Sequence, residues 1–198
     1  MIKIAITGNI ASGKSTVQKI IEEHGYSVLD ADVTGHEVLD EEQQTIISAF
    51  YNEDICTNGG KISREKLGKI VFNDAKKKKT LEQIVHPKIE EKIIDFFNNN
   101  TDENFVFVGI PLLFETGMQN LFDKIILVYT NDEIREKRLI ERNNYTEEYA
   151  KSRLNCQRSQ DEKKYLSDYI IYNNGKFEDL EKSVEELLSK LGKGNESA

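Results

Sequence analysis

The fold of this chain is decided by one stretch near its start, Gly8-Asn9-Ile10-Ala11-Ser12-Gly13-Lys14-Ser15. It fits the pattern G-x-x-x-x-G-K-S/T at every fixed position, and this pattern is typical of loops that bind phosphate. The glycines let such a loop wrap with its backbone N–H groups pointing inward, where they and the N-terminus of the next helix bind phosphate oxygens. Lys14 is expected to reach the β- and γ-phosphates of a nucleotide, and the Ser15 hydroxyl is expected to bind Mg²⁺.

The residues on either side of this loop support the interpretation. Residues 2–7 are apolar for the length of one buried strand, and residues 14–24 place Val17, Ile20 and Ile21 on one helix face. A chance glycine-rich turn before a helix is the alternative, and the complete motif in this context disfavours it. The dinucleotide-binding pattern G-x-G-x-x-G does not fit, because an isoleucine stands two residues after the first glycine.

The rest of the chain alternates strand and helix patterns. We predict strands over residues 26–29, 105–110, 124–129 and 169–172. We predict helices over residues 36–51, 63–73, 75–98, 132–143 and 177–191, and two more within 146–166. The pattern over 75–98 is expected to break at His86, with Pro87 opening a new helix, because proline has no N–H and suits the first helical position. This alternation predicts a parallel α/β sheet.

The composition is that of an ordinary globular protein, with 38% apolar and 31% charged residues among 198. That length suits one compact domain with insertions. No segment approaches the run of about 20 apolar residues that a membrane-spanning helix needs. Cys56 and Cys156 form no C-x-x-C pair, which disfavours a disulfide framework or zinc cluster and fits a cytoplasmic location. The net charge of −8 argues against broad binding to nucleic acid or membranes.

Two carboxylates, Asp30 and Asp32, follow the second predicted strand. Alternation along a strand would put both on the same face, at the carboxyl end where parallel strands border a ligand crevice. A carboxylate there can accept the proton of an attacking hydroxyl or hold Mg²⁺ through water. A helix N-cap or a solvated turn is the alternative, and for Asp30 the two interpretations stand about equal.

Three arginines, Arg135, Arg138 and Arg142, are spaced so that they share one helix face, and Arg153 and Arg158 follow. Arginines on a closing lid are one way to bring positive charge to a phosphate in transfer. The alternative is a surface helix with exposed ion pairs, each worth about 0.3–0.5 kcal/mol. For Arg135 and Arg153 this surface interpretation is at least as well supported.

The ordered combination of these segments resembles the dephospho-coenzyme A kinase family, and the resemblance covers nearly the whole chain. The matching segments are 6–8 with 13–17, 29–32, 62–64 with Leu67, 71–72, 84–87, 110–115, Arg138-Leu139 with Arg142, and 168–169 through 173–175. The resemblance implies a three-layer P-loop kinase fold, with a five-stranded parallel sheet, an inserted helical subdomain and a helical lid. It implies a nucleotide-binding core over residues 1–32 and 101–198, a lid over about 135–158, and a coenzyme A-binding subdomain over 33–100.

The resemblance also implies an activity: ATP, with Mg²⁺, phosphorylates the 3′-hydroxyl of dephospho-coenzyme A, the last step of coenzyme A synthesis. Asp32 would take the proton of that hydroxyl, and Lys14, Arg138 and Arg142 would act on the phosphates. The nucleotide would be held by Gly8, Asn9, Ala11, Ser12, Gly13, Lys14, Ser15, Thr16, Asn174 and Gly175. The substrate would be bound by Asp32, Arg64, His86, Pro111, Leu112 and Glu115. For His86, the alternative is that it only caps a helix. For Pro111, Leu112 and Glu115, the alternative is that they form a turn and pack on the core.

The chain departs from the family pattern at two positions of the phosphate loop, where Asn9 and Ala11 replace glycines. Asparagine tolerates a positive φ better than most residues, and Ala11 is expected to take a right-handed or extended backbone. The loop is expected to keep its shape, with an altered affinity for nucleotide.

Two other functions remain open from the residues alone. One is a P-loop kinase that acts on a nucleoside or nucleotide, against which the helical block with Ile84-Val85-His86-Pro87 argues. The other is a GTP-dependent switch, which needs an N-K-x-D guanine-binding motif, and the sequence has no Asn-Lys pair. For assembly we expect a monomer or a weak homo-oligomer.

Overall fold

The computed structural model describes residues 1–195 of the chain. It divides into two compact units, one formed by Met1–Leu29 together with the chain from Asn100 onward, the other by Asp30–Asn99. No helix of the described residues is both long and apolar enough to cross a bilayer.

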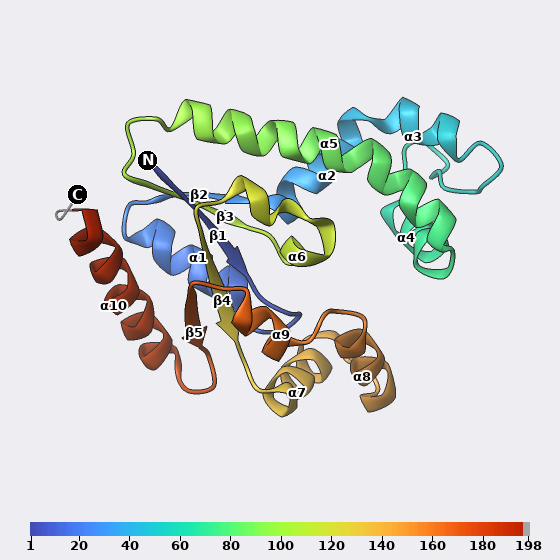
Figure 1. Ribbon diagram of the computed structural model, residues 1–198. Coiled ribbons are helices and arrows are strands. Elements are labelled where there is room, and N and C mark those ends of the chain that lie inside the picture. The colour runs from blue at the N-terminus through green and yellow to red at the C-terminus, as the bar shows by residue number, and fades with distance from the viewer. Residues whose placement is uncertain (196–198) are drawn as a thin grey trace. The chain divides into compact units, whose positions relative to one another are not determined.

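The first unit is built on a five-stranded sheet of order β2-β3-β1-β4-β5 (Figure 1). Its strands are β1 (Ile2–Thr7), β2 (Ser27–Asp30), β3 (Phe105–Gly109), β4 (Lys124–Tyr129) and β5 (Tyr169–Tyr172). β1 pairs in parallel with β3 and β4, and β4 pairs in parallel with β5. The fold class predicted from the sequence is therefore confirmed.

Two helices, α1 (Lys14–Glu23) and α10 (Phe177–Asn195), pack against each other and the sheet. Together with the sheet they enclose the main core, where Phe107, Ile126 and Val184 are fully buried. The spacing of apolar residues in the last helix predicts a single stripe formed by Phe177, Leu180, Val184, Leu187, Leu188 and Leu191. The structure buries the last five of these residues, whereas Phe177, at the first position of the helix, is 51% exposed and does not belong to the stripe.

Shorter helices follow β3 and β4 in the first unit. They are α6 (Leu113–Thr116), the 3-10 helix η1 (Met118–Leu121), α7 (Asp132–Asn143), α8 (Glu147–Asn155) and α9 (Gln160–Tyr165). α7 and α8 pack together around Leu139, Ala150 and Leu154, and this small core also touches Ile10 and Ala11 of the phosphate loop. The helix over 132–143 and the two within 146–166 are confirmed.

The second unit is helical, with α2 (Ala31–Glu41), α3 (Gln43–Ala49), α4 (Arg64–Asn73) and α5 (Ala75–Asn99). Its core gathers Ile46, Phe50, Ile55 and Leu67. Ser63 caps α4 by accepting a hydrogen bond from the backbone N–H of Lys66.

The predicted break at His86 is wrong, because α5 is one helix that runs through Pro87. A proline inside a helix costs about 3 kcal/mol, since it removes one backbone hydrogen bond and its ring crowds the preceding turn. Apolar residues before the proline, Leu81, Ile84 and Val85, pack on the core of the unit, and Ile93 and Phe97 after it are buried. Burial on both sides of the proline outweighs that cost and keeps the helix continuous.

Candidate active site

The phosphate loop connects β1 to α1 in a tight curve. Gly13 has φ 94°, and a Cβ atom there would lie 2.1 Å from Asn173 Nδ2. A Cβ atom on Gly8 would lie 2.4 Å from Ser12 Oγ and 2.9 Å from the Val128 carbonyl oxygen. Both glycines are therefore required by the space around them, and Gly13 also by its left-handed backbone.

The chemistry of this loop fits the phosphates of a nucleotide. Ser12 is 1% exposed, and its hydroxyl has no hydrogen-bond partner among the described residues. An unpaired buried hydroxyl is costly, so its presence points to a ligand that accepts from it. Lys14 opens α1, is 9% exposed and donates from Nζ to Gln18 Oε1 at 2.7 Å. An anion in the loop would meet this ammonium and the N-terminus of a ten-residue helix.

Ala11 does not take the backbone expected for it. Its φ is 62°, in the left-handed region, whereas Asn9 is not among the residues with positive φ. The loop therefore keeps a glycine-like conformation at a residue that carries a Cβ atom, which costs about 1–2 kcal/mol. The methyl group is half-buried against the core between α7 and α8, which offsets part of that cost.

The variant Ala11→Gly should be more stable than the native protein by about 0.5–1 kcal/mol, because the relief of left-handed strain exceeds the added entropy of the unfolded chain. Urea unfolding of both proteins measures the difference in the free energy of unfolding. A less stable variant would mean that packing of the methyl group outweighs the strain.

The outer side of the phosphate loop is held by the segment between α8 and α9. Asn9 is buried, and its Nδ2 donates to the carbonyl oxygen of Arg158 at 2.9 Å. The backbone N–H of Ile10 donates to Gln157 Oε1 at 2.7 Å. A glycine at position 9 could not make the first of these bonds, so this departure from the family pattern adds a link between the loop and the segment.

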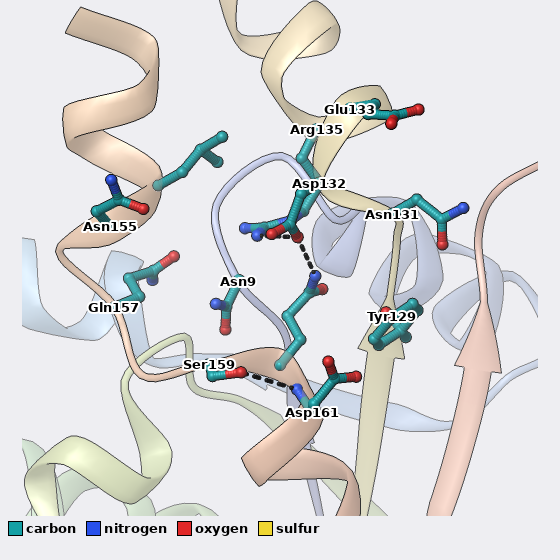
Figure 2. A pocket seen from close by; sticks show the side chains of 12 residues that line it. Asn9, Tyr129, Asn131, Asp132, Glu133, Arg135, Asn155, Gln157, Ser159 and Asp161 are labelled. Carbon is teal, nitrogen blue, oxygen red and sulfur yellow. Dashed lines mark hydrogen bonds and ion pairs between the residues drawn. The ribbon is translucent and has the colours of Figure 1, made fainter. Parts of the chain in front are cut away.

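A polar cavity of about 450 Å³ opens beside this link, between α7, the end of β4 and the segment that leads from α8 into α9 (Figure 2). Its lining comes from Asn9, Tyr129, Asn131, Asp132, Glu133, Arg135, Leu154, Asn155, Gln157, Ser159, Gln160 and Asp161.

The three arginines of α7 have different surroundings. Arg135 is 3% exposed, forms an ion pair with Asp132 at 2.6 Å and donates to the Ile10 carbonyl oxygen at 3.4 Å. The surface interpretation is wrong for this residue, because its guanidinium braces the phosphate loop. Arg138 donates from Nη2 to the Asn173 carbonyl oxygen at 3.1 Å, whereas Arg142 is exposed and bonds Asn143 Oδ1 at 2.9 Å.

The turn after β5 lies beside the start of α7. Asn174 Oδ1 accepts a hydrogen bond from the backbone N–H of Asn131 at 2.8 Å. Asn131 is the N-cap residue of α7, yet its own side chain makes no capping bond. A Cβ atom on Gly175 would lie 2.8 Å from Asp179 Oδ2, and Asp179 Oδ2 accepts a hydrogen bond from the backbone N–H of Lys176 at 3.2 Å. The bonds to Asn131 and from Lys176 therefore tie this turn to the starts of α7 and α10.

Glu115 and Lys163 form a pair that sequence analysis did not foresee. Lys163 is fully buried, and its Nζ lies 2.9 Å from Glu115 Oε1. Burial lowers the pKa of the Lys163 ammonium, and the Glu115 carboxylate acts against that shift. The same carboxylate oxygen accepts from the backbone N–H of Arg158 at 3.1 Å. No spacing in the sequence relates Glu115 to a lysine so far along the chain, so only the fold reveals the pair.

Removing the ammonium in Lys163→Met should destabilise the fold by about 2–3 kcal/mol, because Glu115 would then lose its partner in a mostly buried setting. Thermal melting should show a fall of roughly 4–10 °C for a chain of this size. The double variant Glu115→Gln/Lys163→Met should recover at least half of that fall. A double variant that melts no higher than Lys163→Met would refute this account of the pair.

Pro111 and Leu112 continue from β3 toward α6. The Pro111 carbonyl oxygen accepts from Thr7 Oγ1 at 3.3 Å, which ties this turn to the end of β1. Leu112 is 39% exposed and leaves an apolar side chain at the surface there.

In the second unit, Asp30 and Asp32 do not share a strand face. Asp30 ends β2 and caps α2, its Oδ1 accepting from the N–H groups of Asp32 and Val33 at 2.8 and 3.4 Å. The N-cap alternative for Asp30 is thus the correct one. Asp32 lies in the first turn of α2 and is exposed, so the argument from strand alternation is wrong for it.

The other two substrate-site candidates also belong to the second unit. Arg64 is exposed at the start of α4, where its Nη2 pairs with Asp40 Oδ2 at 2.9 Å. His86 lies within the continuous α5 and is half-buried, so it caps no helix.

A five-stranded sheet of order β2-β3-β1-β4-β5 with a phosphate loop after β1 is the fold of a P-loop kinase. Residues 2–179 match the family model described as dephospho-CoA kinase. The chain belongs to the dephospho-CoA kinase family.

Relatives and solved structures agree with this membership. A dephospho-CoA kinase of Listeria monocytogenes serovar 1/2a is 39% identical over 196 residues, covering 96% of this chain and 97% of the relative. One of Helicobacter pylori is 39% identical over 191 residues, covering 95% and 96%. The crystal structure of TT1252 from Thermus thermophilus superposes with a TM-score of 0.86 at 32% identity, over 96% of this chain and 97% of that one. The dephospho-CoA kinase from Campylobacter jejuni gives 0.74 at 37% identity, over 98% of both chains.

Proposed function

We propose that this protein transfers the γ-phosphate of ATP to the 3′-hydroxyl of dephospho-coenzyme A, giving coenzyme A and ADP. The observation that carries the proposal is the phosphate loop, with its unpartnered Ser12 hydroxyl and adjoining Lys14, in a chain whose family match spans residues 2–179. The loop argues for a nucleotide, and the family argues for the acceptor.

The nucleotide is bound in this proposal by the loop from Gly8 to Thr16. The N–H groups of the loop and the start of α1 surround the phosphates, and Lys14 neutralises charge on the β- and γ-phosphates. Ser15 would hold Mg²⁺, which supplies further charge neutralisation between those phosphates. Asn174 and Gly175 would receive the adenine.

The acceptor is bound by the second unit, Asp30–Asn99, in its proposed role as coenzyme A-binding subdomain. Asp32 acts as the general base, and Arg64 and His86 bind the substrate. Pro111, Leu112 and Glu115 are further proposed substrate-binding residues. Arg64 has a guanidinium group suited to paired contacts with phosphate oxygens.

The chemistry is an in-line displacement without a covalent enzyme intermediate. The 3′-hydroxyl oxygen forms a bond to the γ-phosphorus, the bond between that phosphorus and the β–γ bridging oxygen breaks, and ADP leaves. The hydroxyl proton passes to the Asp32 carboxylate. Arg138 and Arg142 stabilise charge on the transferring group, and closure of residues 135–158 would exclude water, which otherwise competes as acceptor.

The proposal is tested by measuring ADP release from MgATP with a panel of acceptors. Dephospho-coenzyme A should stimulate release strongly, while adenosine and nucleoside monophosphates should leave it at the basal rate. Stimulation by a nucleoside or nucleotide instead would keep the kinase and change the acceptor. Release that is indifferent to every acceptor would reject the phosphotransferase and favour a nucleotide-binding switch.

A further inference from the structure

Asn173 stands at the point where the last strand of the sheet reaches the phosphate loop. It follows β5 directly and is 7% exposed. Its backbone N–H donates to the Tyr129 carbonyl oxygen at 2.8 Å, which extends the pairing of β4 and β5 by one residue. Strand pairing therefore fixes the backbone of Asn173, and the side chain is held by a rigid element of the fold.

The amide nitrogen of Asn173 holds one carbonyl group of the phosphate loop. Nδ2 donates to the Ser12 carbonyl oxygen at 2.8 Å, and the single hydroxyl proton of Thr130 is shared between that oxygen at 2.9 Å and the Asn173 carbonyl oxygen at 3.1 Å. In a trans peptide the carbonyl and N–H groups point in opposite directions. The Asn173 amide, which holds the Ser12 carbonyl toward itself, therefore holds the Gly13 N–H away from itself.

Asn173 can approach the phosphate loop this closely because residue 13 is a glycine. A Cβ atom on Gly13 would lie 2.1 Å from Asn173 Nδ2, far inside any allowed separation. The glycine thus serves the approach of the asparagine as well as the left-handed φ of 94°. The phosphate loop and the Asn173 side chain are therefore packed directly against each other.

The oxygen atoms of Asn173 hold an arginine of α7. Arg138 Nη2 donates to the Asn173 carbonyl oxygen at 3.1 Å and to Oδ1 at 3.4 Å. The guanidinium of Arg142, on the same helix, donates instead to Asn143 Oδ1 at 2.9 Å. The side-chain amide of Asn173 therefore joins the phosphate loop, through Nδ2, to Arg138, through Oδ1, and the backbone carbonyl oxygen of Asn173 adds the shorter contact to the same guanidinium.

We propose that Asn173 is a positioning residue that sets the Ser12–Gly13 peptide and the Arg138 guanidinium relative to each other, so that phosphate binding and charge delivery both depend on this residue, with its amide as the link between the two. This inference rests on the proposed kinase function. An amide is needed because it carries a donor and an acceptor on one planar group. An aspartate at this position would keep an oxygen that accepts from Arg138. Its other oxygen would face the Ser12 carbonyl oxygen, to which it could not donate a hydrogen bond.

A double-mutant cycle tests the coupling. Asn173→Ala should lower kcat about tenfold, by loss of the side-chain hydrogen bonds to the loop and to Arg138, while the backbone contact to Arg138 remains. Added to Arg138→Ala, it should cost no more than about a further threefold, because the arginine whose position it sets is already gone. Added to Arg142→Ala, the matched control on the same helix, it should cost its full tenfold. Equal losses in both backgrounds would overturn the proposal.

A second variant separates positioning from general support of the fold. Asn173→Asp should raise the KM for ATP about tenfold and leave the KM for dephospho-coenzyme A within about twofold, since only the loop loses its donor. An unchanged KM for ATP would count against the role at Ser12. The native protein is assayed first, and no turnover with dephospho-coenzyme A would reject the proposed kinase function. In that case the affinity for a fluorescent ATP analogue, measured over the same double-mutant cycle of Asn173→Ala and Arg138→Ala, would still test the coupling.

Discussion

Replacing Lys14 by alanine should lower kcat by about 10²–10³-fold, the loss expected when one preorganised charge is removed from a transferring phosphoryl group. The residue is 9% exposed at the first position of α1, so its ammonium lies where the loop would bring phosphates. The KM for ATP should rise as well, because the same charge binds the ground state.

Steady-state ADP release at saturating dephospho-coenzyme A measures this loss. Lys19→Ala is the matched control: it removes an exposed lysine from the same helix, whose ion pair with Glu23 at 3.6 Å is worth little, and should keep near-native turnover. A Lys14→Ala variant with native kcat would remove that residue from the mechanism.

Replacing Asp32 by asparagine should lower kcat by about 10²–10⁴-fold, the contribution usual for a positioned general base. The substitution preserves the size of the side chain, removes its charge and replaces one carboxylate oxygen by an amide NH₂ group that cannot accept the proton. Since Asp32 lies in the first turn of α2, loss of its charge should also cost about 0.3–1 kcal/mol of stability, too little to unfold the chain.

Asp30→Asn supplies the matched control for this loss. Asparagine caps helices about as well as aspartate and keeps the oxygen that accepts from the N–H groups of Asp32 and Val33. Its turnover should therefore stay close to native. Equal losses in the two variants would show that the effect comes from the charge of the turn as a whole, and native turnover in Asp32→Asn would exclude Asp32 as the base.

Most of the first unit could be predicted because its signals are local. An apolar run of strand length, a complete phosphate-loop motif and a helical stripe stand in direct succession between residues 2 and 24. Each is decided by neighbouring residues, and the structure confirms all three. The errors arise where distant packing opposes a local preference. Pro87 remains inside α5 because of burial on both sides of it, and Ala11 takes φ 62° because the loop requires it.

The side chains that brace the site were harder to predict for the same reason. Asn9 meets Arg158, Lys163 meets Glu115 and Asn173 meets Ser12, each across more than forty residues of sequence. No periodicity or motif spacing connects such pairs. The burial of Arg135 had one local signal, the aspartate three residues before it, with which it forms an ion pair.

The central claim is tested most directly by identifying the product that forms from dephospho-coenzyme A and MgATP. Mass spectrometry should show a gain of one phosphate, and phosphorus–proton coupling in the NMR spectrum should place it on the 3′-oxygen of the ribose. A product phosphorylated elsewhere, or dephospho-coenzyme A recovered unchanged while ATP is consumed, would contradict the account.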